Sequence, residues 1–258
     1  MVRKISFYSY KGGSGRSVSL ANIAFALALK GKNVGCVELD VGAPGLFEIL
    51  NLRQMPAKSC TTLLRYRDPV AVPQSVIDVG TAANISLPGK LYLIPALKRD
   101  VQALDGIEWN PRTMAEFATR VIDTFSKMYE LDFILFDLRS GISNSSLVGL
   151  MLGDEYAVFT RLDKQSIEGT SWLMNSLRRR RDGENNPGHF VVVTGYRGDL
   201  ARISLGRLEE SIGETINYKI PYDDRLNLQE EVVVITRQKD DPVRVAYEQL
   251  VDTEFNDE

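Results

Sequence analysis

Apolar positions along the chain follow two patterns, short continuous runs and longer stretches with helical spacing. Short runs bounded by charged residues or glycine are typical of buried strands, whereas apolar residues every three or four positions predict helices. The first forty residues show a strand at 4–9, a glycine-rich loop, a helix at 17–29 and a strand at 33–39. This order predicts a right-handed βαβ unit.

The same alternation continues to the end of the chain. Strands that alternate with helices predict an α/β fold, a doubly wound, mostly parallel sheet with helices on both faces. Residues 52–90 are less regular and contain scattered Pro, Ser, Thr and Gly, and we interpret them as an excursion within one domain that spans residues 1–258. The remaining strands are expected at 91–95, 132–137, 155–161, 190–194 and 218–221, and the remaining helices at 111–130, 165–180, 200–212 and 243–250.

Composition and charge narrow the class of function. The chain has 258 residues, of which 44% are hydrophobic and 25% charged, with a formal net charge of −3, as in ordinary globular proteins. The single histidine, His189, argues against Ser-His-Asp catalysis and histidine-rich metal sites. Two cysteines without a CxxC pair favour a reducing, cytoplasmic location. No run approaches the roughly 18 apolar residues of a transmembrane helix.

The loop at 11–17, KGGSGRS, carries the clearest candidate chemistry. Glycines between a strand and a helix let backbone N–H groups surround a phosphate, and the helix N-terminus adds the positive end of its dipole. Arg16 keeps a positive charge where an ordinary P-loop has lysine, and Ser17 can place a hydroxyl on Mg²⁺. The alternative is a glycine-rich turn without a ligand. The predicted nucleotide-binding residues are Gly12, Gly13, Ser14, Gly15, Arg16, Ser17 and Val18.

Acidic residues follow two neighbouring predicted strands and suit phosphoryl transfer to water, which needs a metal, charge neutralisation and a group that orients the water. Asp40 would orient the attacking water, and Asp137 would act on Mg²⁺ through a coordinated water. Because the carboxyl ends of parallel strands meet at one edge, we expect Ser17, Asp40 and Asp137 to form the metal site. The alternatives are a helix N-cap for Asp40, a capping carboxylate for Asp137, and either a surface acid or a metal-shell role for Glu38.

At these positions the sequence resembles the MinD/ParA ATPases. The loop at 11–17 is similar to their deviant Walker A box, KGGxGK[ST], and the resemblance runs in order to about residue 234. Further matches are ELD at 38–40, the Walker B strand FILFD at 133–137 and the turn IPYD at 220–223. APGL at 43–46, DLRSG at 137–141 and QSIEG at 165–169 point to a subgroup with KGGxGR[ST].

This resemblance implies Mg²⁺-dependent ATP binding and slow hydrolysis by a homodimer that positions or regulates a macromolecular partner, with an adaptor or regulatory protein as the expected partner. Lys11 would reach the nucleotide of the second subunit, or else be a solvated loop lysine, while Pro221 and Asp223 would border the adenine base. A hydrolysis-poor ATP-sensing switch and an ATP-dependent ligase or synthetase on the same fold remain alternatives.

The arginine run at 178–181 leaves DNA open as a further partner. It follows a predicted helix, so it is either a solvated helix C-terminus, which the dipole favours, or a patch that binds DNA phosphates without sequence preference. The acidic stretch at 252–258 contains no basic amphipathic helix of the kind that MinD-type membrane targeting requires, so we do not expect membrane binding.

Overall fold

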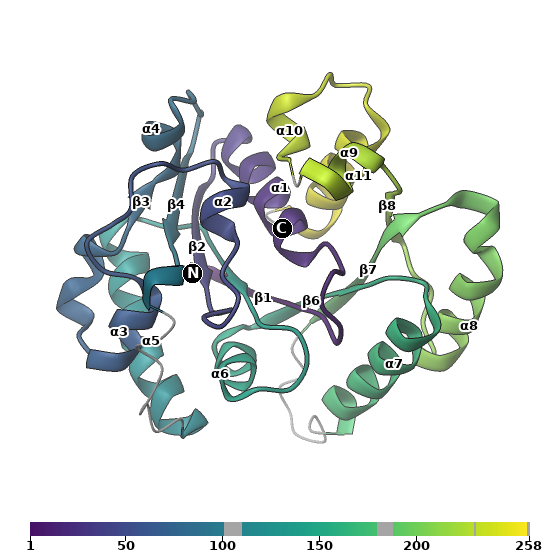
Figure 1. Ribbon diagram of the computed structural model, residues 1–258, viewed down its shortest axis with the longest axis horizontal. Coiled ribbons are helices and arrows are strands. Elements are labelled where there is room, and N and C mark those ends of the chain that lie inside the picture. Colours follow the sequence, from purple (N-terminus) through teal and green to yellow (C-terminus); the bar gives the residue numbers. More distant parts are fainter. Residues whose placement is uncertain (101–109, 180–187, 230, 257–258) are drawn as a thin grey trace.

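Helices and strands alternate throughout the computed structural model, which describes residues 1–100, 110–179, 188–229 and 231–256 (Figure 1). The strands are β1 (Arg3–Tyr8), β2 (Asn33–Glu38), β3 (Ile77–Asp78), β4 (Lys90–Ile94), β5 (Phe133–Asp137), β6 (Glu155–Thr160), β7 (His189–Tyr196) and β8 (Tyr218–Pro221). The α-helices are α1 (Arg16–Leu29), α2 (Leu46–Ile49), α3 (Cys60–Tyr66), α4 (Val79–Ala83), α5 (Pro111–Met128), α6 (Asn144–Leu152), α7 (Lys164–Arg179), α8 (Arg202–Ile212), α9 (Asp224–Gln229), α10 (Val233–Thr236) and α11 (Pro242–Glu254), and the 3₁₀ helices are η1 (Pro69–Gln74) and η3 (Gly198–Ala201).

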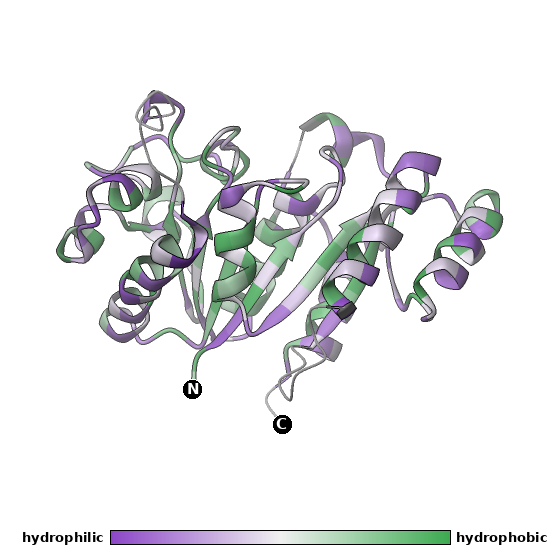
Figure 2. Ribbon diagram, turned by 90° about the horizontal axis from the view of Figure 1, so that it is seen from below, coloured by the Kyte–Doolittle hydropathy of each residue, from purple (hydrophilic) through white to green (hydrophobic). Residues whose placement is uncertain are grey.

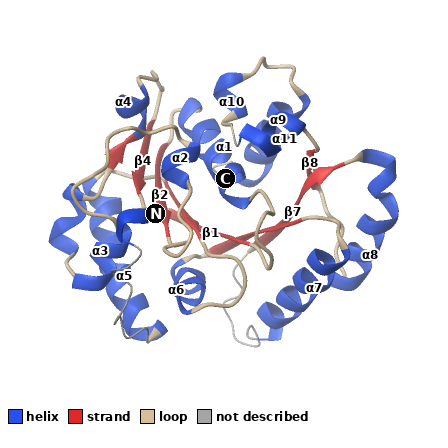
Figure 3. Cartoon of the chain, in the orientation of Figure 1, coloured by secondary structure: helices blue, strands red, loops and turns tan. Residues whose placement is uncertain are grey.

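One eight-stranded sheet runs through the molecule in the order β3-β4-β2-β5-β1-β6-β7-β8 (Figure 3). All neighbouring strands are parallel except the edge pair β3 and β4. The predicted fold class, a doubly wound and mostly parallel α/β sheet, is confirmed. Strand β1 lies between β5 and β6, and Phe7 pairs with Asp137, which in turn pairs with Glu38. The glycine loop therefore begins beside the acidic ends of β5 and β2.

Helices cover both faces of this sheet, and each face has its own apolar core. One core joins the sheet to α1, α2, α10 and α11, while the other joins it to α3, α5, α6, α7 and α8. In Figure 1 the first group lies above the sheet and the second below it. Figure 2 shows the hydrophobic residues concentrated in the strands and the helix sides that face them.

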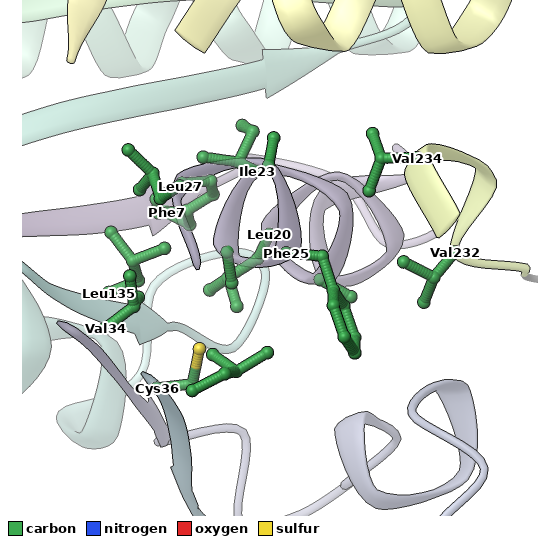
Figure 4. Close-up of a cluster of buried hydrophobic side chains, with 14 of the residues drawn as sticks. Phe7, Leu20, Ile23, Phe25, Leu27, Val34, Cys36, Leu135, Val232 and Val234 are labelled. Carbon is green, nitrogen blue, oxygen red and sulfur yellow. The ribbon is translucent and has the colours of Figure 1, made fainter. Parts of the chain in front are cut away.

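Helix α1 is apolar on almost every side because it lies between the sheet and α10 and α11. Its Leu20, Ile23 and Leu27 pack near Phe7 of β1 and Leu135 of β5, and all five side chains are buried (Figure 4). A helix enclosed in this way is held rigidly, so the loop at its N-terminus starts from a fixed point. Cys36, also in this core, is unpaired, and burial raises the pKa of its thiol.

Local capping explains where three covering helices begin. Asn110 accepts hydrogen bonds from two N–H groups at the start of α5, and Asp241 does the same for α11. Each is followed by proline at the first helical position, a residue suited to that place because its nitrogen has no proton to satisfy. Ser143 forms a capping box with Ser146 at the start of α6.

The excursion at 52–90 holds more regular structure than its composition suggests. It contains α3, η1 and α4, and its two-residue strand β3 joins the sheet edge antiparallel to β4. Such a strand is too short to give an alternating pattern.

Helix α6 is not predicted from the sequence, because its polar residues Ser145 and Ser146 are buried with its apolar ones and obscure the helical period. None of the helices in the described part of the chain has the length and apolarity that a membrane span requires.

Candidate functional site

The loop between β1 and α1 presents an open helix N-terminus at the carboxyl edge of the sheet. Gly13 and Gly15 both have φ of 73°, in the left-handed region that favours glycine. Gly15 is the N-cap of α1 and makes no side-chain capping hydrogen bond, and the first helical hydrogen bond runs from Ser19 N to Gly15 O at 2.9 Å. The N–H groups before Ser19 can therefore donate to an anion, and the helix dipole favours one there.

The side chain of Arg16 contacts both Asp40 and Asp137, the two acids predicted to lie at the carboxyl edge of the sheet. Its Nε donates to Asp137 Oδ1 over 2.6 Å, and its Nη2 lies 3.5 Å from Asp40 Oδ2. The same Nη2 lies 3.3 Å from Ser17 Oγ. Arg16 is 7% exposed and Asp137 1%. The guanidinium thus lies at the point where the oxygens of Ser17, Asp40 and Asp137 converge.

These oxygens are the ligand type that Mg²⁺ prefers, and the position of a cationic group among them indicates that the site accepts positive charge. Within the described ranges, no group of three or more His, Cys, Asp or Glu side chains is suited to hold a metal by itself. A cation held by Ser17, Asp40 and Asp137 would need further oxygens, and phosphates and water supply these in nucleotide sites. The residues present therefore fit Mg²⁺ bound together with a nucleotide.

Asp40 combines two interactions. One carboxylate oxygen accepts from Ala43 N at 3.2 Å, while the other faces Arg16. Burial raises the pKa of Asp40, against the charge of Arg16, which lowers it. The alternative of a helix N-cap is wrong: Asp40 caps a turn at Ala43, whereas the next helix, α2, begins after Gly45.

Glu38 is fully buried, so a surface role for this acid is wrong. Its Oε1 accepts from the N–H groups of Gly45 and Leu46 at 2.6 and 2.8 Å, and its Oε2 accepts from Ala96 at 3.0 Å. Burial raises the pKa of Glu38, while these three N–H donors lower it. Glu38 therefore joins the loop after β2, which carries Asp40, to the segment after β4.

Lys11 lies at the exposed side of the loop and is held within its own chain. Its Nζ lies 2.9 Å from Gln165 Oε1 and 3.5 Å from Asp163 Oδ1, both near the start of α7. Tyr10, which stands where an ordinary P-loop has glycine, turns toward the same helix and contacts Trp172 edge-on, with ring centroids 6.1 Å apart. Lys11 is thus more than a freely solvated residue, and α7 is the element that orders it.

A cavity of about 200 Å³ lies beside the glycine loop and brings together residues far apart in sequence. Gly13, Gly15 and Val18 line one side, and Pro221 and Asp223 of the turn after β8 line another. The carboxylate of Asp223 is occupied by Arg237 and by Leu226 N, so it shapes the turn rather than facing a ligand freely. Three of the seven predicted loop residues and both predicted turn residues therefore line one cavity.

Three further residues of this region, Thr194, Arg161 and Asn227, are not predicted from the sequence. Thr194 of β7 donates to the carbonyl of the buried Ser14 over 2.6 Å and so fixes the middle of the glycine loop. Arg161 and Asn227 line the cavity and hydrogen-bond each other at 3.1 Å. A threonine inside a valine-rich strand gives no local signal of this role, because the contact spans 180 positions. The remaining loop residue, Gly12, lies beside Ser140 of the loop after β5.

The arginine run gives less support to DNA binding than its charge suggests. Arg178 donates to the carbonyl of Ile212 and lies 3.3 Å from Glu214, so it joins α7 to the end of α8. Arg178 is therefore paired within the chain, although its side chain is 37% exposed. Residues 180 and 181 lie outside the described residues.

The sequence is similar to a protein family and to known proteins over most of its length. The model of the family AAA_31, described as an AAA domain, matches residues 2–187. The septum site-determining protein MinD of Escherichia coli K12 is 26% identical over 227 residues, which cover 85% of this chain and 77% of that protein.

Two solved structures share the fold at low sequence identity. The MinC:MinD cell division protein complex of Aquifex aeolicus aligns with a TM-score of 0.78 at 19% identity and covers 100% of this chain and 97% of that chain. The septum site-determining protein MinD complexed with Mg-ADP, from Pyrococcus horikoshii OT3, aligns with a TM-score of 0.77 at 19% identity and covers 98% and 95%.

Proposed function

This chain belongs to the AAA domain family and is a P-loop ATPase of the MinD/ParA type, and from that premise we propose that it binds Mg²⁺·ATP at residues 11–17 and hydrolyses it slowly. The observation that carries the proposal is the convergence of Ser17, Asp40 and Asp137 on Arg16, beside an open helix N-terminus. The Mg-ADP complex of the Pyrococcus relative supports the same ligands here.

In this proposal each residue has a distinct task. The loop N–H groups and Arg16 neutralise the phosphates, and Asp40 orients the attacking water. Ser17 directly and Asp137 through water would hold Mg²⁺, which would supply charge neutralisation at the phosphate oxygens. Pro221 and the Asp223 turn border the base in the cavity next to the loop. Hydrolysis breaks the bond between the γ-phosphorus and the bridging oxygen, and water supplies the new oxygen of the released phosphate.

We further propose that ATP switches the chain from monomer to homodimer, and that the dimer acts on a partner protein. The exposed position of Lys11 at the edge of the loop supports this, because a second subunit can reach it. The MinC:MinD complex of the Aquifex neighbour supports a protein partner. The two cysteines are buried and unpaired, which agrees with a reducing cytoplasm.

One observation favours a second candidate, an ATP-binding switch with little turnover. Arg16 pairs with Asp137 and Asp40, so phosphate would compete with these two acids for its guanidinium. A steady-state phosphate-release assay with Mg²⁺·ATP separates the two candidates. Release above a control without protein supports the ATPase, and stoichiometric ATP binding without release supports the switch. Absence of both binding and release contradicts the proposed function.

A further inference from the structure

A second arginine, Arg139, lies at the same edge of the sheet and is exposed. Among the residues that the structure describes, it has no hydrogen-bond or ion-pair partner. Arg16, in contrast, is buried between two acids. An exposed guanidinium next to a candidate phosphate site is free to bind an anion without first losing a partner.

The backbone around Arg139 is fixed from both sides. Leu138 N donates to Phe7 O at 3.1 Å, and Gly141 N donates to Ser9 O at 3.0 Å, so the loop after β5 is bonded to the end of β1. A Cβ built on Gly12 would lie 3.6 Å from Ser140 Oγ, which places this loop directly against the glycine loop.

The side chain of Arg139 crosses toward the turn that carries Asp40. A Cβ built on Gly42 would overlap Nη1 of Arg139 and lie only 3.2 Å from its Cζ. The guanidinium therefore packs against the backbone of Gly42, and only a residue without a side chain permits that approach. Arg139 thus lies between the glycine loop, which the loop after β5 contacts, and the turn after Asp40, which its guanidinium contacts.

We propose that Arg139 binds the terminal phosphate of ATP, and that Gly42 keeps it in place to do so. This inference rests on the proposed ATP site and deepens it. Arg16 and the loop amides serve the phosphates nearer the base, while Arg139 recognises the group that distinguishes ATP from ADP. Arginine suits this task because its fork can bind two phosphate oxygens at once.

The test is calorimetric binding of ADP and of the non-hydrolysable ATP analogue AMPPNP, both with excess Mg²⁺. Arg139→Ala should weaken AMPPNP binding about ten- to hundredfold, as expected for a charge-assisted hydrogen bond, and change ADP binding less than about threefold. Arg139→Lys should recover part of the loss. Gly42→Ala should reproduce it, because the new methyl group displaces the guanidinium without removing its charge.

Matched controls come from exposed positions on α8. Arg202→Ala removes an arginine that is 79% exposed, and Gly206→Ala adds a methyl group where no atom lies within 4 Å, so both should leave the AMPPNP-to-ADP preference unchanged. Equal loss for both nucleotides in Arg139→Ala, or no loss, overturns the inference while the ATP site stands. If the parental chain binds neither nucleotide, the proposed function fails and the inference fails with it.

Discussion

Arg16 and Asp137 form a buried ion pair in which Nε and Oδ1 are 2.6 Å apart, and it joins the first residue of α1 to the last residue of β5. Removing one member of such a pair leaves an uncompensated charge, which is strongly destabilising. In the proposed function, binding of Mg²⁺·ATP would therefore be an exchange, in which phosphate oxygens would replace the carboxylate at Arg16 and the cation would replace the guanidinium at Asp137.

Replacing Ser17 by Ala tests whether this hydroxyl serves a metal. Loss of an outer-shell partner of a metal ligand already costs about 10–100-fold in metal affinity, so loss of a direct ligand should weaken Mg²⁺·ATP binding at least about tenfold. Binding of ATP in excess chelator should change little. Titration calorimetry of both conditions, with Ser176→Ala on α7 as the control, measures the difference. Equal losses with and without Mg²⁺ would show that Ser17 is no metal ligand.

Asp40→Asn separates water positioning from the structural role of this residue. The amide oxygen still accepts from Ala43 N, so the turn is kept, while the negative charge at the reaction is lost. We expect turnover to fall on the order of a hundredfold or more with ATP binding retained. Phosphate release at saturating ATP measures this, and Asp199→Asn, which is 91% exposed in its side chain, serves as control. A parental rate in Asp40→Asn would reduce Asp40 to a turn cap.

Local signals made the fold and the phosphate loop predictable, whereas the contacts that complete the site are nonlocal. Apolar runs predict the βαβ unit at the start of the chain and the buried strands. Gly13 and Gly15 indicate the loop, because only glycine readily adopts the left-handed backbone that it requires. The sequence did not decide between a surface role and a metal-shell role for Glu38, because its three N–H partners come from segments up to 58 positions away. The ion pairs of Arg16 were unpredicted for the same reason: no sequence pattern states which acid an arginine faces.

Glu38→Gln should destabilise the fold although the two side chains have the same shape. A carboxyl group offers acceptor lone pairs on both oxygens, but an amide nitrogen offers none, so one of the three N–H groups would face a donor. An unsatisfied buried group costs about 1–3 kcal/mol in the free energy of unfolding. Urea denaturation measures the loss. Glu48→Gln, at an exposed ion pair with Lys98, should change the free energy of unfolding much less than Glu38→Gln, and equal effects would refute the buried role of Glu38.

Arg237→Met should destabilise the turn that lines the cavity, because Arg237 is 5% exposed in its side chain and pairs with Asp223, Glu231 and Asp241. We expect a loss of about 3 kcal/mol at neutral pH. Arg225→Met, at the neighbouring arginine that is 63% exposed, should cost less than about 1 kcal/mol.

The ion pair between Arg237 and Asp223 predicts how the loss of stability in Arg237→Met depends on pH. The hydrogen bonds of Arg237 hold the pKa of Asp223 below its ordinary value of 3.8. The folded state therefore binds fewer protons there than the unfolded state, and this stabilisation is present above pH 3.8 and is lost as the pH falls through the lower folded pKa. The difference between parent and Arg237→Met should shrink in acid, as urea denaturation at pH 7 and near pH 3 can show; a constant difference would contradict the linkage.

The central claim is that ATP switches this chain between two assembly states through Lys11. Because Asp40→Asn is expected to bind ATP without rapid turnover, it should hold the ATP-bound state long enough to be measured. The account requires Lys11 to exchange its contacts with Gln165 and Asp163 for the nucleotide of the second subunit in this state, so Lys11→Ala should remove the switch while ATP still binds.

The most direct measurement is the molar mass by light scattering, with and without Mg²⁺·ATP, for Asp40→Asn and for the double variant with Lys11→Ala. The account predicts that the mass of Asp40→Asn rises from that of the 28.9 kDa monomer to twice that value when ATP is added, and that the double variant stays monomeric. A mass that is the same with and without ATP in Asp40→Asn, or a double variant that still dimerises, would contradict it.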